Sequence, residues 1–219
     1  MKSFNEWLLE GLNYPCIVVD VQPQYCQHEH PFMQTNYQTI CEKIISFINK
    51  QTGPVLMFVN AEDSGLTNDT ISSIKQSWEE IVRELSGDYE DEYPINWDRF
   101  EIVDKGYGYL RSWMDRGVPN NIIIATIREL YAQKKSDSRE LVFAGNIKHR
   151  SPIQSEIQNT IEEMDGDPLI VNWISVGQLR KFNGAYIMGG GRNECLREVE
   201  LLMNAFNIKY KRIESLVYG

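Results

Sequence analysis

Long apolar runs are missing from this chain of 219 residues. No stretch approaches the roughly 18 consecutive apolar residues that a transmembrane helix needs. Residues 1–12 alternate polar and apolar side chains and lack the unbroken apolar stretch of a secretory signal peptide. These absences predict a cytoplasmic protein that neither crosses nor binds a membrane.

Positive charge is in deficit. The chain has 22 Lys and Arg against 31 Asp and Glu, a net charge of −9. Nucleic acids and anionic membranes need a basic footprint on the protein, so we expect neither as the main partner. A small-molecule substrate fits this charge better. The length suits a single domain spanning residues 1–219 with a core that needs no disulfide staples.

Cysteine and histidine are also scarce. The four cysteines, at positions 16, 26, 41 and 195, show no CxxC spacing, which favours free thiols in a reducing compartment. Cys26, His28 and His30 alternate along one segment and could face a zinc ion together. A fourth ligand is not visible, so we predict neither a metal site nor a cofactor.

Short apolar runs alternate with helical patterns, which is typical of parallel βαβ units. Strands are expected at 16–21, 54–60, 100–103, 141–144, 169–174, 185–188 and 209–217. Helices are expected at 37–49, 70–85, 121–135 and 153–164, and again after residue 188. The pattern predicts an α/β fold of three layers, Rossmann-like, with an open and mostly parallel sheet of about six strands. The apolar first strand should be central and the charged last strand should lie at an edge.

A glycine-rich turn is the most informative segment. Three glycines at 189–191 follow the strand at 185–188, and Cys195 stands in the first turn of the next helix. Free N–H groups and partial positive charge at a helix start favour a thiolate, the reactive form of cysteine. Cys195 is therefore a candidate nucleophile at the carboxyl end of a strand. Two alternatives are a cysteine that only packs in the core and a phosphate-binding turn.

Two further polar residues stand where apolar strands end. Asp20 lies in Ile-Val-Val-Asp-Val-Gln, where a carboxylate is costly unless it is paired, serves a site or caps a turn. Gln22 shares the face of Asp20 by strand alternation. Lys105 follows the strand at 100–103. Because parallel strands end at the same sheet edge, Lys105 could lie beside Asp20 and Cys195, or else be a solvated surface lysine.

These segments resemble the isochorismatase-like cysteine hydrolases, a family that includes nicotinamidases and other small-amide hydrolases. The Asp-x-Gln strand end, the segment Val-Asp-Lys-Gly-Tyr and the glycine-rich exit before the cysteine occur here in the order of that family. The resemblance implies a triad of Asp20, Lys105 and Cys195. Asp20 would be the general base, Lys105 would balance the charges, and Cys195 would attack a carbonyl and form a thioester.

The resemblance also implies how a substrate would be held. Backbone N–H groups between Gly191 and Cys195 would stabilise the oxyanion. The residues expected to contact substrate are Gln22, Gly190, Gly191 and Glu194. Members of the family form homo-oligomers, so the resemblance implies one here as well.

Some features depart from the family pattern. The interval from Gly145 to Ser151 resembles the family's spacing, with Ser151 in the place of the nucleophile. We favour Cys195, since the triple glycine and the thiol suit a nucleophile better, and this choice requires an inserted βα segment around 136–183. The segment after the second strand has no histidine near Asp63, so a nicotinamidase-type metal site is not expected.

We therefore expect a cysteine-dependent hydrolase of a small amide or related C–N bond. The alternative is a catalytically inactive binding or regulatory protein on the same fold, which the insertion and the missing histidine favour. Arginines could bind an anionic substrate or simply be solvated; they are Arg111, Arg128 and Arg139.

Overall fold

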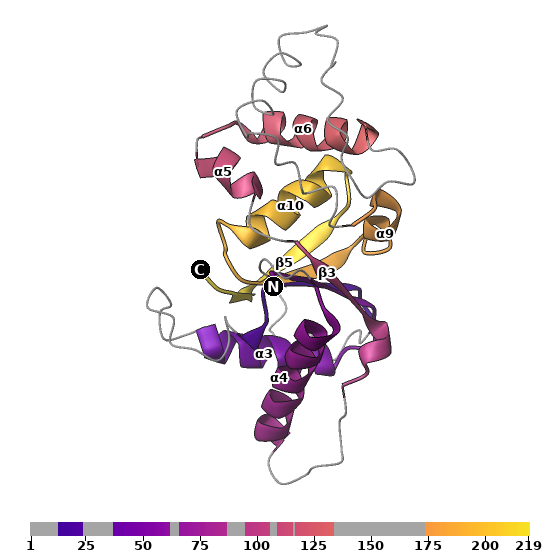
Figure 1. The fold of residues 1–219 in the computed structure, drawn as a ribbon, viewed down its shortest axis with the longest axis vertical. Helices are drawn as coiled ribbons and strands as arrows, with labels where there is room; N and C mark the ends of the chain where they lie inside the picture. Colours follow the sequence, from indigo (N-terminus) through magenta and orange to yellow (C-terminus); the bar gives the residue numbers. More distant parts are fainter. Residues whose placement is uncertain are drawn as a thin grey trace, which may run out of the picture.

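The computed structural model describes residues 13–23, 37–61, 66–86, 95–105, 109–115, 117–133 and 174–219. They form an open parallel sheet between two layers of helices, which confirms the expected α/β architecture (Figure 1). The expected strand at 141–144, nearly all of that at 169–174 and the expected helix at 153–164 lie outside the described residues. The inserted segment around 136–183 therefore stays a prediction.

The described sheet has five strands, all parallel, in the order β3-β2-β1-β4-β5. The strands are β1 (Cys16–Val19), β2 (Val55–Val59), β3 (Phe100–Asp104), β4 (Ala185–Gly189) and β5 (Tyr210–Val217). Every residue of β1 and β2 is buried, as expected for central strands covered on both faces. The charged strand β5 lies at an edge, as predicted.

Helices cover both faces of the sheet (Figure 1). One layer consists of α3 (Tyr37–Asn49) and α4 (Asn68–Ser86). The other consists of α5 (Tyr109–Asp115), α6 (Asn120–Gln133), α9 (Val176–Arg180) and α10 (Cys195–Ala205). A short 3₁₀ turn, η2 (Trp97–Arg99), leads into β3. The expected helices that fall on described residues are confirmed, but α5 and α9 were not predicted, because so few turns show no clear periodicity.

Strand alternation divides the core into two clusters. Ile17 and Val19 of β1 pack toward the layer of α10, whereas Cys16 and Val18 pack toward α3 and α4. The chain runs outward from β1 through β2 to β3 and then returns to place β4 on the other side of β1. The direction in which successive strands are added to the sheet therefore reverses between β1 and β4. Open α/β sheets bind their ligands at the carboxyl ends of strands at such a switch point.

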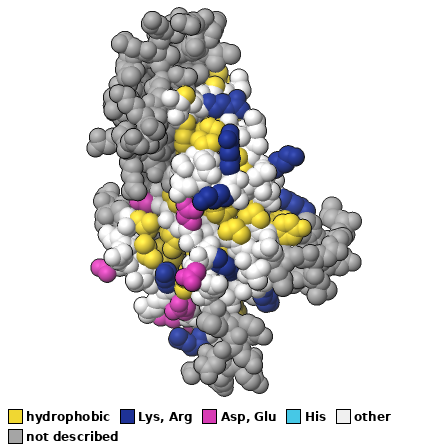
Figure 2. Space-filling model, turned by 90° about the vertical axis from the view of Figure 1, so that its right-hand side faces the viewer, with side chains coloured by type: hydrophobic (Ala, Val, Ile, Leu, Met, Phe, Trp, Pro, Cys, Tyr) yellow, Lys and Arg dark blue, Asp and Glu magenta, His cyan; other side chains and the backbone are white. Residues whose placement is uncertain are grey.

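The surface shows no single dominant charge on the face in view. None of the helices in the described ranges is long and apolar enough to cross a membrane. On the face shown in Figure 2, the basic side chains are separated from one another and mixed with acidic and hydrophobic ones. A nucleic-acid surface would gather them. The expectation that nucleic acid is not a partner stays a prediction.

Candidate active site

Asp20 is the first residue after β1, and its backbone is held in an uncommon conformation. Its φ is 56°, in the left-handed region, which Asp tolerates better than most residues. Its N–H donates to the Phe58 carbonyl at 2.9 Å, and its own carbonyl accepts from the Tyr218 hydroxyl at 2.6 Å. These two bonds fix the turn that leaves the carboxylate buried beside the switch point.

Lys105 is the first residue after β3, and its side chain is almost fully buried. Its N–H donates to the Val59 carbonyl at 2.8 Å, which continues the pairing with β2. Its Nζ lies 3.4 Å from Oδ2 of Asp20 and donates to Sγ of Cys195 at 3.1 Å. Because β2 separates β3 from β1, the lysine must reach across the end of β2, and its long side chain makes that possible.

Cys195 is the first residue of α10, and a tight glycine turn brings it beside β1. The φ of Gly189 is +115°, and a Cβ there would lie 2.1 Å from the Val19 carbonyl oxygen. A Cβ on Gly190 would lie 2.2 Å from the ring of Tyr218. Only glycine allows the backbone to pass this closely to β1 and to the C-terminal segment. The Asp20 carboxylate lies close enough to the thiol to raise its pKa.

The same turn provides backbone donors. The N–H of Gly190 donates to Val19, and that of Arg192 donates to Tyr218. The N–H of Glu194 returns to the Gly191 carbonyl at 2.8 Å. Within the described residues, three N–H groups of the turn have no acceptor, those of Gly191, Asn193 and Cys195. These three are the donors that the turn can offer to an oxyanion.

The electrostatics of the three residues favour a charged lysine and a neutral thiol. Burial lowers the pKa of Lys105, but the nearby Asp20, Cys195 and Glu198 raise it further, so the net shift is upward. Burial raises the pKa of Asp20, and the ammonium of Lys105 opposes that shift. Burial and repulsion from Asp20 also raise the pKa of Cys195, against the attraction of Lys105. The direction of this shift is opposite to the easy ionisation expected from the helix start, because burial and the neighbouring carboxylates outweigh the attraction of Lys105.

This arrangement makes a prediction about thiol reactivity. Since Asp20 raises the pKa of Cys195, Asp20→Asn should lower that pKa, by about one unit or more. The pH dependence of iodoacetamide alkylation at Cys195, followed by peptide mass spectrometry, measures it. Asp104→Asn is the matched control, because Asp104 also ends a strand and its Oδ1 accepts from the Ala61 N–H, a bond that an amide oxygen preserves. Equal thiol pKa values in wild type and Asp20→Asn would contradict the arrangement.

The remaining expected substrate contacts have other neighbours. The Gln22 amide donates to the Asn60 carbonyl at 2.7 Å and accepts from its N–H at 2.8 Å. It therefore braces the ends of β1 and β2, and its contact with substrate stays a prediction. Glu194 stands directly before α10, and its charge raises the pKa of Asp20, so it lies near the site. Gly190 and Gly191 lie in the turn, at the carboxyl end of β4.

The other candidates lie elsewhere or outside the described residues. Arg128 on α6 donates to the Ala205 carbonyl, at the end of α10 opposite to Cys195. Outside the described residues are Cys26, His28, His30, Asp63, Arg139 and Ser151, together with the side chain of Arg111. Within the described residues, no three His, Cys, Asp or Glu side chains are grouped closely enough to hold a metal ion.

Sequence reasoning missed two residues next to the triad. Glu198, one turn after Cys195 on α10, is fully buried, and its charge acts on Lys105 and Cys195. Its spacing of three residues from Cys195 was a usable signal, because such residues share a helix face. Tyr218 binds Asp20 through its hydroxyl and the glycine turn through its backbone. No local pattern in the sequence indicates that contact.

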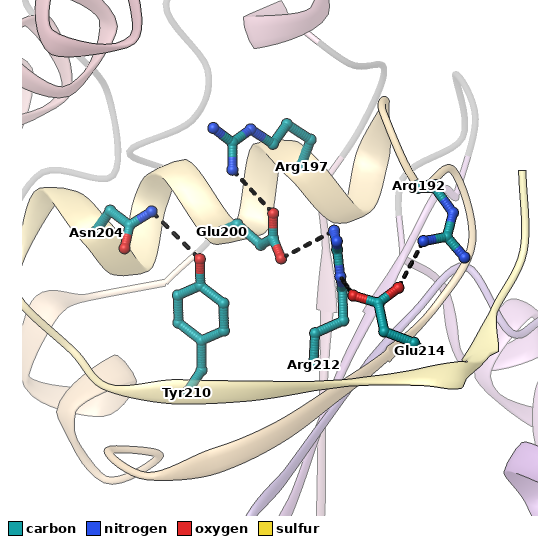
Figure 3. Close-up of polar contacts among 7 residues, drawn as sticks. All are labelled: Arg192, Arg197, Glu200, Asn204, Tyr210, Arg212 and Glu214. Atoms are coloured by element: carbon teal, nitrogen blue, oxygen red, sulfur yellow. Dashed lines mark hydrogen bonds and ion pairs between the residues drawn. The ribbon is translucent and has the colours of Figure 1, made fainter.

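A network of ion pairs ties α10 to β5 (Figure 3). Glu200 on α10 pairs with Arg197 at 3.1 Å and with Arg212 of β5 at 3.3 Å. Glu214 pairs with Arg212 at 2.6 Å and with Arg192 of the glycine turn. The network joins the turn, the helix that carries Cys195 and the edge strand, so it supports the position of the thiol without touching it.

Searches against protein-family models, curated proteins and solved structures find no match to this chain. Similarity to known proteins therefore assigns this chain to no family. What stands is an α/β protein with an open, all-parallel sheet, in which Asp20, Lys105 and Cys195 form a triad-like cluster at the switch point.

Proposed function

We propose that this protein is a cysteine-dependent hydrolase of a small amide or a related C–N bond, of the isochorismatase-like type. One observation carries the proposal: the ammonium of Lys105 lies 3.1 Å from Sγ of Cys195 and 3.4 Å from Oδ2 of Asp20. Three residues from three separate strand ends thus meet, with Asp20 and Lys105 buried and Cys195 partly exposed. Burying the charged side chains of Asp20 and Lys105 costs free energy, and a reaction at this site is a reason for that cost.

The geometry supports a two-stage reaction. Sγ attacks the carbonyl carbon of the amide while the thiol proton passes to Asp20, and Lys105 stabilises the negative charge that develops on sulfur. The N–H groups of Gly191, Asn193 and Cys195 would stabilise the oxyanion. The C–N bond then breaks as protonated Asp20 returns its proton to the leaving amine, which leaves a thioester. Water, deprotonated by Asp20, hydrolyses the thioester and releases the carboxylic acid and the thiol.

The raised pKa of Asp20 suits the role of general base. A carboxylate is a stronger base when its pKa lies nearer to the working pH. Burial raises the pKa of Asp20, and the positive charge of Lys105 opposes part of that rise. The thiol is protonated at rest, so the proton moves only when a substrate carbonyl is in place.

The alternative is a binding protein that kept the fold without catalysis. The burial that raises the pKa of Cys195 favours it, because a protonated thiol is a poor nucleophile. Ammonia release from a panel of small primary amides, together with intact-mass detection of an acyl adduct on Cys195, separates the two. A hydrolase releases ammonia and shows the adduct. A binding protein does neither, while its melting temperature still rises with the ligand.

Charge around the triad makes a prediction about the substrate. The carboxylates of Asp20, Glu194 and Glu198 act on the site against the ammonium of Lys105. A neutral or cationic amide should therefore be hydrolysed with a higher kcat/KM than one that carries a carboxylate, by about tenfold or more. Benzamide, 4-(aminomethyl)benzamide and 4-carbamoylbenzoate form a matched series. A preference for the carboxylate would contradict this.

A further inference from the structure

Tyr218 contacts both the end of β1 and the glycine turn, although the reaction above does not use it. Its hydroxyl donates to the Asp20 carbonyl at 2.6 Å. Its N–H donates to the Gly189 carbonyl at 3.1 Å, and its own carbonyl accepts from the Arg192 N–H at 3.0 Å. A Cβ on Gly190 would lie 2.2 Å from the ring of Tyr218, so the ring lies directly against the turn. One residue thus joins the end of β1 to the turn that leads into α10.

The position of the Asp20 carboxylate depends on the main chain of that residue. Its Oδ2 pairs with Lys105, but its Oδ1 has no hydrogen-bond partner among the described residues. The main chain has a φ of 56°, a conformation that residues with a Cβ seldom adopt. The N–H of Asp20 donates to the Phe58 carbonyl, which continues the pairing of β1 with β2. The bond from Tyr218 is the one that ties the Asp20 peptide to the glycine turn.

The hydroxyl of Tyr218 is itself held in place by packing. The residue is 6% exposed and belongs to the core cluster that includes α3 and α4. Tyr37 of α3 packs edge-on against its ring, with the two centroids 4.7 Å apart and the planes at 76°. A buried hydroxyl needs an acceptor, and the Asp20 carbonyl provides one. A donor held in this way limits how far the Asp20 peptide can rotate.

We propose that Tyr218 is a positioning residue of the same site, which sets where the Asp20 carboxylate lies relative to the Cys195 thiol. The proposal rests on the proposed function, because the transfer of the thiol proton to the carboxylate depends on that placement. The bonds to Gly189 and Arg192 hold the turn that carries the cysteine, and the hydroxyl holds Asp20 relative to that turn. Tyr218 gives up no proton and forms no covalent bond in the reaction.

The chain offers a matched pair of variants. Tyr218→Phe removes the hydroxyl and keeps the ring and both peptide groups. Tyr131→Phe is the control, because that hydroxyl also donates to a main-chain carbonyl, the one of Ile174, at 2.9 Å. Tyr131 lies on α6 and packs against Phe206, which follows the end of α10 opposite to Cys195. Each variant loses one hydrogen bond of the same kind, so a loss of stability alone would affect both alike.

A double-mutant cycle measures the placement of Asp20 without any substrate. Oδ2 of Asp20 and Sγ of Cys195 both lie within 3.4 Å of the Lys105 ammonium, and the charge of Asp20 raises the pKa of the thiol. A carboxylate that samples several positions acts on the thiol more weakly than one held beside it. In Tyr218→Phe, Asp20→Asn should therefore lower the thiol pKa about half as much as in wild type, or less. In Tyr131→Phe the shift should equal that in wild type.

The pH dependence of iodoacetamide alkylation at the cysteine gives the thiol pKa in each background. Shifts of one size in all three backgrounds overturn the proposal, and no shift in any of them is one such result. If Tyr218→Phe does not fold, Tyr37→Leu replaces it, because it removes the ring that packs against Tyr218. A smaller Asp20→Asn shift is then expected, and a shift of wild-type size overturns the proposal.

This cycle can fail separately from the proposed function. A reduced shift without ammonia release removes the hydrolase reaction but leaves Tyr218 as the residue that places Asp20. Ammonia release with equal shifts removes Tyr218 from the site and leaves the reaction standing. In an active protein, Tyr218→Phe should lower kcat by about tenfold or more and change KM less than about twofold, because the proton moves only after the substrate has bound. Tyr131→Phe should change neither constant.

Discussion

Cys195→Ala is expected to lower kcat/KM for any amide that the protein hydrolyses by a factor of about 10³ or more. The reason is that the variant keeps Asp20 and Lys105 but removes the atom that would form the thioester. Cys195→Ser should lose nearly as much, because a hydroxyl is a much weaker acid than a thiol and Asp20 would have to deprotonate it. Ammonia release at saturating amide concentration measures kcat, and release at low amide concentration measures kcat/KM.

Cys41→Ala is the control for this experiment. Cys41 is fully buried and lies on α3, in the core cluster on the opposite face of the sheet from α10. Its removal should leave kcat/KM unchanged. Undiminished ammonia release by Cys195→Ala would remove the cysteine mechanism, and loss of activity in both variants would indicate a general effect on folding.

Gly189→Ala is expected to destabilise the protein by about 3 kcal/mol or more. Two causes act together at this residue. Its φ of +115° is unfavourable for any residue with a Cβ, and that Cβ would lie 2.1 Å from the backbone oxygen of Val19. Val19 belongs to the central strand β1, so neither backbone can move without breaking the sheet. Urea unfolding followed by tryptophan fluorescence measures the loss.

Two other glycines separate these causes. Gly184 has a φ of +86° with nothing within 4 Å of its Cβ position, so Gly184→Ala should cost only the backbone strain, about 1 kcal/mol. Gly177 lies in α9 with a Ser175 side-chain oxygen 3.9 Å away, and Gly177→Ala should be neutral or slightly stabilising. If all three variants unfold at the same urea concentration, neither the positive φ of Gly189 nor its close approach to Val19 requires glycine at that position.

Much of the fold was predictable from local pattern. β1 and β2 are short apolar runs, and α3 begins and ends at the residues that its apolar periodicity predicts. The charges on β5 predicted an edge strand correctly. The two helices that were missed, α5 and α9, have seven and five residues. The α9 helix is defined mainly by a capping box between Ser175 and Gln178.

The candidate site was predictable for a related reason. Asp20 interrupts an apolar strand, Lys105 follows one, and Cys195 follows a glycine turn. Parallel strands end at one sheet edge, so residues at three such ends can meet although Lys105 and Cys195 are 90 positions apart. The sequence could not tell whether they do meet. That depends on the strand order, which puts β4 beside β1 and leaves β2 for the lysine to cross.

The sequence by itself thus determined the parallel α/β fold and the three residues able to carry the chemistry, because both follow from polar residues placed against short apolar runs. Only the tertiary structure decided the protonation of the site. Burial and the carboxylates of Asp20 and Glu198 raise the pKa of the Cys195 thiol, the reverse of what its place at a helix start suggested. Desolvation and charge repulsion depend on which side chains converge from distant segments, and no local pattern records that convergence.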